Sequence, residues 1–301
     1  MIRHIPEGLV PFEDCGYART PCQPFVGDEV LIDCRCEARP LLEVEGTDGL
    51  LEPVQMPDRW RFVLAAYTQA AVLRYRFRTA GETSCWYETD VLKKRTVDSP
   101  LCVGKGWALL APGIWLKAEQ TQGCVTIGLC STAPEDSVCE GMTFGGKGLW
   151  TLEQDGKTLA CCKRMELGLR ADGTVAHQQM VLSGSQRRVY GTGERFDRVD
   201  QQGSGSCGQV VEHFTQQGEW SYLPVPCFLT DGGFGFYRTG GCDVAMQFDE
   251  TIRITSLSRE GMTDYLLLGI VWIVFSLPVV TFGAATTAML YTAGKTIRQG
   301  E

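Results

Sequence analysis

The sequence predicts a mainly β protein, a large antiparallel β-sandwich followed by a C-terminal hydrophobic helical tail. Apolar and charged residues alternate over Val72–Arg78, turn dipeptides recur between apolar runs, and residues 265–294 contain no Asp, Glu, Lys, Arg or His. An alternation of period two indicates a strand with one buried and one solvated face. An uncharged run longer than about 20 residues is typical of a membrane-spanning helix.

The β-sandwich is predicted over residues 1–256. After the alternating segment, two short β-like runs lie between Trp107 and Leu129. Turn dipeptides then follow at Asp155-Gly156, Asp172-Gly173, Asp231-Gly232 and Gly240-Gly241. Such dipeptides are typical of hairpins. No convincing amphipathic helix separates them, so the pattern favours one all-β unit over a βαβ fold.

The C-terminal part is predicted to enter a membrane. Residues 257–264 form the predicted linker, and residues 265–301 a transmembrane helix or a kinked helix pair. The run 265–294 lacks the polar stripe of a soluble helix of this length. Pro278 must kink or end a helix, so a single kinked span and a span followed by a second helix both stay open. The lipid bilayer is therefore an expected partner through residues 265–294.

The N-terminus predicts no export. Its first residues contain no continuous apolar segment and are interrupted by Pro6 and Pro11, so they do not form a secretory signal. We expect a membrane-associated protein whose sandwich domain lies in the cytoplasm. The 14 cysteines are then expected to be reduced, buried thiols.

The composition argues against several classes of function. The 301 residues carry 28 Lys+Arg and 36 Asp+Glu, a formal charge of −8. Nucleic acid is not an expected partner, because binding phosphates needs a basic face. No C-x-x-C pair occurs and only three His are present, so neither a metal site nor a cofactor is predicted. His4 and His177 are expected at the surface or in hairpins.

The segment Gly203–Gly208, GSGSCG, formally fits G-x-G-x-x-G. It neither follows a clear strand nor opens a helix, so its context does not support phosphate binding. A flexible Gly/Ser loop is predicted instead.

Two segments, Val189–Gly203 (VYGTGERFDRVDQQG) and Val211–Tyr237 (VEHFTQQGEWSYLPVPCFLTDGGFGFY), resemble a known domain. They are similar to the N-terminal domain of glycoside hydrolase family 31, the α-glucosidase and α-xylosidase family. The matching residues are Tyr190, Gly191, Gly193, Glu194, Arg195 and Phe196, then Tyr222, Pro224, Pro226 and Phe228, then Gly233, Phe234, Gly235 and Phe236.

This resemblance implies a galactose mutarotase-like β-sandwich that binds carbohydrate of the α-glucoside or α-xyloside type. In the family, the nucleophile and the acid/base are Asp residues of a (β/α)8 barrel that follows this domain. The sequence leaves the family pattern near residue 256, before any barrel strand. No catalytic residue is therefore predicted, and the chain is not expected to be an enzyme on its own.

Local carboxylates offer an alternative source of catalysis. Retaining hydrolysis needs two carboxylates about 5–5.5 Å apart. The local carboxylates are Glu194, Asp197, Asp200, Glu212 and Glu219, but the family does not use them for catalysis. Glu194 and Arg195 are expected to form a structural ion pair.

The loop His213–Trp220 supplies the candidate binding residues. In family members, the corresponding loop reaches the mouth of the active site and touches sugar. Phe214, Gln216, Gln217 and Trp220 are predicted to contact carbohydrate, since aromatic rings stack on sugar faces and amides hydrogen-bond hydroxyls. The alternative is that both aromatic residues belong to a core.

The segment Ile270–Glu301 resembles a second family, the small YesL-like bacterial membrane proteins of unknown function. The matching residues are Ser276, Leu277, Pro278, Val279, Val280, Thr281, Gly283, Ala284, Leu290, Tyr291, Lys295 and Arg298. This resemblance supports membrane insertion and implies no activity.

Together these observations favour a non-catalytic, carbohydrate-binding accessory domain of a family 31 type α-glycosidase, tethered to a membrane. One alternative is a truncated or fused gene fragment without activity of its own. The other is a glycoside hydrolase acting on α-glucosides or α-xylosides if another chain supplies the barrel.

Overall fold

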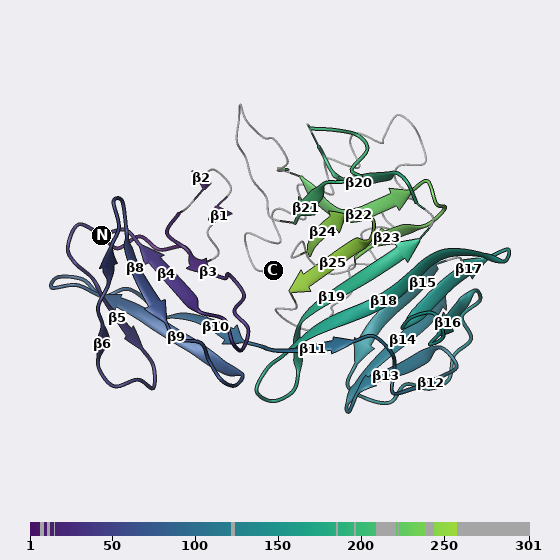
Figure 1. The fold of residues 1–301 in the computed structure, drawn as a ribbon, viewed down its shortest axis with the longest axis horizontal. Coiled ribbons are helices and arrows are strands. Elements are labelled where there is room, and N and C mark those ends of the chain that lie inside the picture. The colour runs from purple at the N-terminus through teal and green to yellow at the C-terminus, as the bar shows by residue number, and fades with distance from the viewer. Residues whose placement is uncertain are drawn as a thin grey trace. The chain divides into compact units, whose positions relative to one another are not determined.

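The computed structural model consists of antiparallel β-sheets, which confirms the mainly β prediction (Figure 1). It describes residues 1–6, 9–10, 13–14, 16–121, 124–184, 186–195, 197–208, 221, 223–238 and 244–257. These residues include no helix, and hence no apolar helix of membrane-spanning length. The predicted tail 265–301 and residues 258–264 of the linker lie outside the described residues.

Two four-stranded sheets form an N-terminal sandwich. The first has the order β3-β4-β8-β7, with β3 (Arg19–Thr20), β4 (Val30–Cys34), β8 (Trp60–Leu64) and β7 (Val54–Gln55). The second has the order β10-β9-β5-β6, with β10 (Tyr87–Val91), β9 (Ala71–Arg78), β5 (Leu41–Val44) and β6 (Leu50–Leu51). A separate two-stranded sheet pairs β1 (Leu9–Val10) with β2 (Glu13–Asp14).

Strand β9 shows how the sequence builds this sandwich. Leu73, Tyr75 and Phe77 are fully buried in its core. The arginines between them lie on the other face of β9, where Arg76 pairs with Glu43 of β5 at 2.7 Å. The predicted alternation of a buried and a solvated face is therefore confirmed.

An eight-stranded sheet dominates the rest of the chain, and in Figure 1 its strands β17, β18, β19, β25 and β24 lie side by side. Its order is β16-β17-β18-β19-β25-β24-β21, and β11 also pairs with β18. The strands are β11 (Lys93–Val97), β16 (Met142–Phe144), β17 (Trp150–Gln154), β18 (Lys157–Leu169), β19 (Val175–Gly184), β21 (Gly205–Cys207), β24 (Val244–Phe248) and β25 (Ile252–Leu257).

Two smaller sheets contribute to the same core. One has the order β12-β13-β14-β15, with β12 (Cys102–Gly104), β13 (Trp107–Ala111), β14 (Ile114–Thr121) and β15 (Cys124–Cys130). The other has the order β20-β22-β23, with β20 (Val189–Gly193), β22 (Pro224–Thr230) and β23 (Gly235–Tyr237).

The described residues form two hydrophobic cores within the stretch that the sequence predicts as one sandwich. Both lie in the compact unit Met1–Phe236 with Cys242–Arg259. The N-terminal core includes Ile32 and Phe62, and the second core includes Met165 and Phe248. The single sandwich over 1–256 stays a prediction; period-two alternation identifies a buried face and not the face that packs on it.

The predicted Asp-Gly turns are present where the structure describes them. Asp155 and Gly156 join β17 to β18 with φ of 51° and 74°, the positive values that a type I′ hairpin requires. Asp172-Gly173 joins β18 to β19, and Asp231-Gly232 joins β22 to β23. Gly240-Gly241 lies outside the described residues.

The segment predicted as a flexible Gly/Ser loop contains strand β21 instead. Gly205 lies opposite Gln247 of β24, and Cys207 lies opposite Ala245. The backbone of Gly208 extends this pairing by donating to the carbonyl of Val244 at 2.7 Å. Backbone hydrogen bonds need no side chains, so the small side chains of Gly205–Cys207 did not prevent this strand from pairing with β24.

His4 is not the surface or hairpin residue that the sequence predicts, whereas His177 does lie in a hairpin, opposite Gly168 in the β18–β19 pair. His4 is 7% exposed, and its Nδ1 and Nε2 lie 2.7 Å from the Asp33 carbonyl and 2.9 Å from the Tyr75 hydroxyl. His177 lies within β19, and its ring packs edge-on against Phe25 with centroids 5.3 Å apart.

The described cysteines are free thiols. Burial is confirmed for Cys34, Cys139, Cys161 and Cys162, but Cys22, Cys85, Cys102 and Cys124 are exposed.

Candidate functional site

The predicted binding loop His213–Trp220 lies outside the described residues. Phe214, Gln216, Gln217 and Trp220 all lie outside the described residues, so their contact with carbohydrate stays a prediction. The motif strands before and after this loop are described and pair with each other, β20 with β22.

Strand β20 passes unusually close to β22. Gly191, Thr192 and Gly193 have φ of 114°, 71° and 98°. A Cβ atom on Gly193 would lie 2.0 Å from the carbonyl oxygen of Leu223. Positive φ is costly for a β-branched residue, yet Thr192 is fully buried there. Glycine is therefore needed at Gly191 and Gly193 because of the positive φ, and at Gly193 also because the Leu223 carbonyl lies so close.

Asp197 is bound by Arg195, which corrects the expected pairing with Glu194. Nε and Nη2 of Arg195 lie 3.1 Å and 3.0 Å from the two carboxylate oxygens of Asp197. Nη1 of the buried Arg195 donates to the Gly205 carbonyl at 2.9 Å. The hydrogen bond from Arg195 lowers the pKa of Asp197.

Asp200 is bound by backbone amides. Its Oδ1 accepts hydrogen bonds from the amides of Val189 and Gln202, both at 3.1 Å. Asp197 and Asp200 therefore hold the motif segment in place, which gives both carboxylates a structural role. Glu212 and Glu219 lie outside the described residues.

Two tryptophans lie together on the sheet β12–β15. The ring centroids of Trp107 (β13) and Trp115 (β14) are 5.1 Å apart, with planes at 73°. The adjacent strand residues Ala108 and Leu116 are buried in the core. Because successive side chains point to opposite faces, both tryptophans lie on the face that points away from the core.

The ring of Trp107 is fixed from two sides. Its Nε1 donates to Oδ1 of Asp136 at 2.8 Å. The ring also lies against Gly104, where an added Cβ would come within 2.2 Å of it. These contacts fix the orientation of the indole before any ligand is bound.

A groove of about 300 Å³ adjoins the two rings. It is lined by Lys117, Ala118, Glu119, Cys130, Thr132, Pro134, Glu135, Asp136 and Ser137. Lys117 lies opposite Trp107, and Cys130 lies opposite Trp115. The groove therefore continues the face that carries the tryptophans. We call Trp107, Trp115, Lys117, Glu119 and Asp136 the tryptophan surface.

The tryptophan surface combines aromatic rings with charged hydrogen-bonding groups. Nζ of Lys117 donates to Glu119 at 2.9 Å, and this bond raises the pKa of Lys117. Aromatic rings can stack on the C–H face of a pyranose, while ammonium and carboxylate groups bind its hydroxyls. This arrangement suits a sugar ligand.

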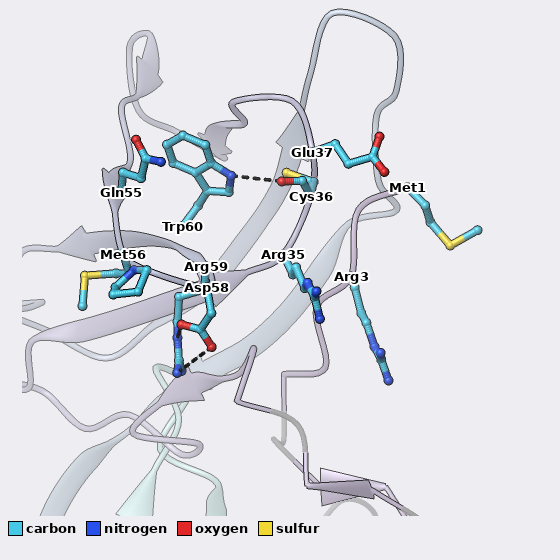
Figure 2. Close-up of a pocket in the computed structure, with 11 residues that line it drawn as sticks. Met1, Arg3, Arg35, Cys36, Glu37, Gln55, Met56, Asp58, Arg59 and Trp60 are labelled. Atoms are coloured by element: carbon cyan, nitrogen blue, oxygen red, sulfur yellow. Dashed lines mark hydrogen bonds and ion pairs between the residues drawn. The ribbon is translucent and has the colours of Figure 1, made fainter.

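A larger groove, of about 570 Å³, lies on the N-terminal sandwich (Figure 2). It is lined by Met1, Arg3, Arg35, Cys36, Glu37, Gln55, Met56, Pro57, Asp58, Arg59 and Trp60. We call it the arginine groove. Trp60 forms part of its wall, and its Nε1 donates to the carbonyl of Cys36 at 3.1 Å.

The residues that the structure describes contain no group of three or more His, Cys, Asp or Glu side chains able to hold a metal ion.

Comparison with known proteins finds similarity of fold. No protein-family model matches the chain, and no curated protein matches its sequence. An uncharacterised protein from Listeria monocytogenes EGD-e has a TM-score of 0.54 and 16% identity, over 87% of this chain and 31% of that chain. The cycloalternan-forming enzyme from Listeria monocytogenes, solved with a pentasaccharide substrate, has a TM-score of 0.53 at the same identity and coverage.

This likeness shows the fold alone, because the identity is only 16%. The chain spans 31% of the length of each of these solved chains. The resemblance to glycoside hydrolase domains is consistent with this shared fold, and no family model supports the resemblance to YesL-like proteins.

Proposed function

We propose that this chain is a non-catalytic carbohydrate-binding domain of a family 31 type α-glycosidase. The tryptophan surface carries the proposal, because it brings two oriented aromatic rings beside a groove with polar groups. A fold shared with an enzyme solved in complex with a pentasaccharide supports the same class of ligand.

The proposed ligand is an α-glucoside or α-xyloside. A pyranose ring stacks on one indole of the tryptophan pair, since the two planes lie at 73°, and its hydroxyls bind Glu119, Lys117 and Glu135 in the adjoining groove. Asp136 orients Trp107 through its hydrogen bond. Phe214, Gln216, Gln217 and Trp220 remain proposed as a second contact with carbohydrate.

The absence of catalysis is part of this proposal. Asp197 stays ionised because Arg195 lowers its pKa, and such a carboxylate is a poor general acid. Asp200 accepts two backbone hydrogen bonds, and using it as a nucleophile would break them. If another chain supplied a barrel, hydrolysis would reside there.

Calorimetric titration of the pure full-length chain with isomaltose and methyl α-xyloside tests the binding. We expect a millimolar Kd, and Trp107→Ala should weaken it at least tenfold, equivalent to about 1.4 kcal/mol. Trp86→Ala is the matched control, since Trp86 stacks on Arg76 of the N-terminal sandwich with 4.3 Å between the guanidinium carbon and the ring centroid. Equal losses in the two variants, or no heat with either sugar, would count against the tryptophan surface.

Turnover of nitrophenyl α-glycosides tests the non-catalytic part. We expect none above the buffer rate. Turnover by pure protein that Glu194→Gln abolishes would contradict the proposal and favour an enzyme that uses local carboxylates.

An accessory domain that packs on another domain is the second candidate. Val225 and Leu229 of β22 are 37% and 61% exposed, and a partner domain packed on this strand would cover them. A gene fragment without its partner domain would aggregate through this strand. Monomeric protein that binds no hydrophobic dye would exclude the fragment interpretation.

Tethering to a membrane through residues 265–294, with the sandwich in the cytoplasm, also remains a proposal. The full-length chain should stay in the membrane pellet after an alkaline carbonate wash. Its release into the supernatant would show that the tail is not inserted.

A further inference from the structure

Strand β15 is an edge strand without the features that normally block pairing with another chain. It is the last strand of the sheet β12-β13-β14-β15, and as far as the chain is described it pairs only with β14. Its seven residues, Cys124–Cys130 (CVTIGLC), include no charged residue and no proline. No other strand at the end of a described sheet has more than five residues. Long, uncharged, apolar edges are the ones that pair with a further strand.

The ladder between β15 and β14 is regular. Its pairs run without a shift from Trp115 opposite Cys130 to Thr121 opposite Cys124, whereas the ladder between β13 and β14 contains a shift in register. A bulge would twist the edge away from an incoming strand. The ladder has none, so the whole length of β15 can pair on its open side.

The two faces of β15 differ in chemistry. Ile127 and Leu129 pack against the core, and they lie opposite the buried Ala118 and Leu116 of β14. The outer face carries the alternate residues Cys124, Thr126, Gly128 and Cys130. A strand that pairs with β15 must show the same alternation, because a slip by one residue would bring its apolar side chains to the outer face.

A second copy of β15 meets this requirement. When two copies run antiparallel about a twofold axis at Ile127, apolar side chains oppose apolar ones and the outer-face residues oppose each other. The pairs are Cys124 with Cys130, Val125 with Leu129, Thr126 with Gly128, and Ile127 with Ile127. This register pairs all seven residues, whereas any other antiparallel register that keeps the two faces pairs at most five of them.

The charges beside β15 do not oppose this arrangement. Lys117 and Glu119 of β14 lie opposite Gly128 and Thr126. In the twofold arrangement, the row of residues that begins at Lys117 of one copy therefore ends at Glu119 of the other. Like charges in directly opposed positions destabilise a strand pair, and this register brings none together.

We propose that β15 pairs with β15 of a second copy of this chain, antiparallel and in the register centred on Ile127. The sheet β12–β15 then continues through both copies. Main-chain hydrogen bonds supply the affinity of such strand addition, and the side chains fix the register. The contact is only one strand long, so we expect a weak dimer. This inference is independent of the proposed sugar binding, because it uses the edge of β15 and not the tryptophan rings.

Oxidative cross-linking of the full-length chain tests the register. Copper phenanthroline should join Cys124 of one copy to Cys130 of the other, because directly opposed residues of an antiparallel pair have Cα atoms within the reach of a disulfide. Mass spectrometry of peptides from the dimer band identifies the linked pair, so a contact made by residues 265–301 is not mistaken for it. Cys124→Ser should abolish this link. Cys102→Ser is the matched control and should keep it, since Cys102 is an exposed thiol of β12, at the other end of the same sheet.

Sedimentation of the full-length chain in mild detergent, over a range of concentrations, measures the dimer itself. Thr126→Lys places two lysines diagonally across the twofold axis, roughly 7–8 Å apart, and their repulsion should raise the dimer dissociation constant several-fold. The matched control is Thr143→Lys, because Thr143 is an exposed threonine of another edge strand, β16. We expect this control to leave the dissociation constant unchanged.

The two experiments have clear outcomes. A dimer that shows the link from Cys124 to Cys130 and is weakened by Thr126→Lys supports the proposal. A chain that is monomeric at every concentration would leave the edge to a different partner and overturns the proposal. A dimer linked through other thiols, or equal dimerisation of Thr126→Lys and Thr143→Lys, overturns it as well. Circular dichroism shows whether each variant folds, and if Thr126→Lys does not, the cross-link in the unsubstituted chain decides.

Discussion

His4 shows how much the fate of one side chain depends on long-range contacts. Its Nδ1 faces the Asp33 carbonyl, which only accepts, so the ring proton lies on Nδ1. Its Nε2 then accepts from the Tyr75 hydroxyl, which itself accepts from Arg19 at 3.2 Å. Both nitrogens are used in the neutral form, and burial lowers the pKa of His4 to about 4.

This lowered pKa predicts a loss of stability in mild acid. The unfolded chain takes up a proton near pH 6.5, whereas folded His4 does so only near pH 4. The stabilisation is complete above pH 6.5 and declines as the pH falls to 4, by roughly 3 kcal/mol in total. The thermal midpoint of the full-length chain, measured from pH 7.5 to 4.5, should show this decline.

His4→Gln keeps a donor and an acceptor without titrating, so its midpoint should fall less steeply with acid. His177→Gln is the comparison variant. Burial also lowers the pKa of His177, so this variant shows how much of the loss of stability in acid comes from a second buried histidine. An unchanged pH profile in His4→Gln would show that the lost stability comes from other groups.

At the scale of single elements, the close approach of β20 to β22 makes Gly193 difficult to replace. Gly193→Ala places a methyl group against the carbonyl of Leu223 at a positive φ. We expect a loss of at least about 2 kcal/mol of unfolding free energy in a urea titration. Gly146→Ala shares the positive φ but has no atom within 4 Å of the new Cβ, so it should lose clearly less. Equal losses of unfolding free energy in the two variants would show that the close approach of the Leu223 carbonyl is not the cause.

Elements with a strong local signal were predictable from the sequence. The alternation in β9 and the Asp-Gly turns depend on neighbouring residues, and both are confirmed. Strand β21 was not predicted, because its pairing with β24 depends on residues about 40 positions away. The tryptophan surface was missed too, although the alternation of Trp115 and Lys117 with buried Leu116 and Ala118 places both on the outer face.

For the whole molecule, two hydrophobic cores predict two units of local stability. Phe77→Ala opens a cavity in the N-terminal core, with a cost of about 3–5 kcal/mol. Hydrogen exchange should then accelerate mainly in β3–β10, while β18, β19 and β25 keep their protection. Phe248→Ala should give the reverse pattern. Uniform acceleration in either variant would indicate one cooperative unit.

The division into two cores could not be predicted from the sequence, for a physical reason. Buried faces of both cores follow the same period of two, and the chain passes from β10 to β11 across the single residue Leu92. No change of composition marks this boundary. The partners of the candidate site are equally non-local, since Trp107 is oriented by Asp136, 29 residues away.

The edge strands of the eight-stranded sheet determine how readily a strand of another polypeptide can pair with it. As far as the chain is described, its terminal strands β16 and β21 have three residues each, and β11 carries exposed Lys93, Lys94 and Arg95. Short or cationic margins offer few free amides and carbonyls to an incoming strand. The sheet is therefore a poor template for amyloid-like growth, despite its size.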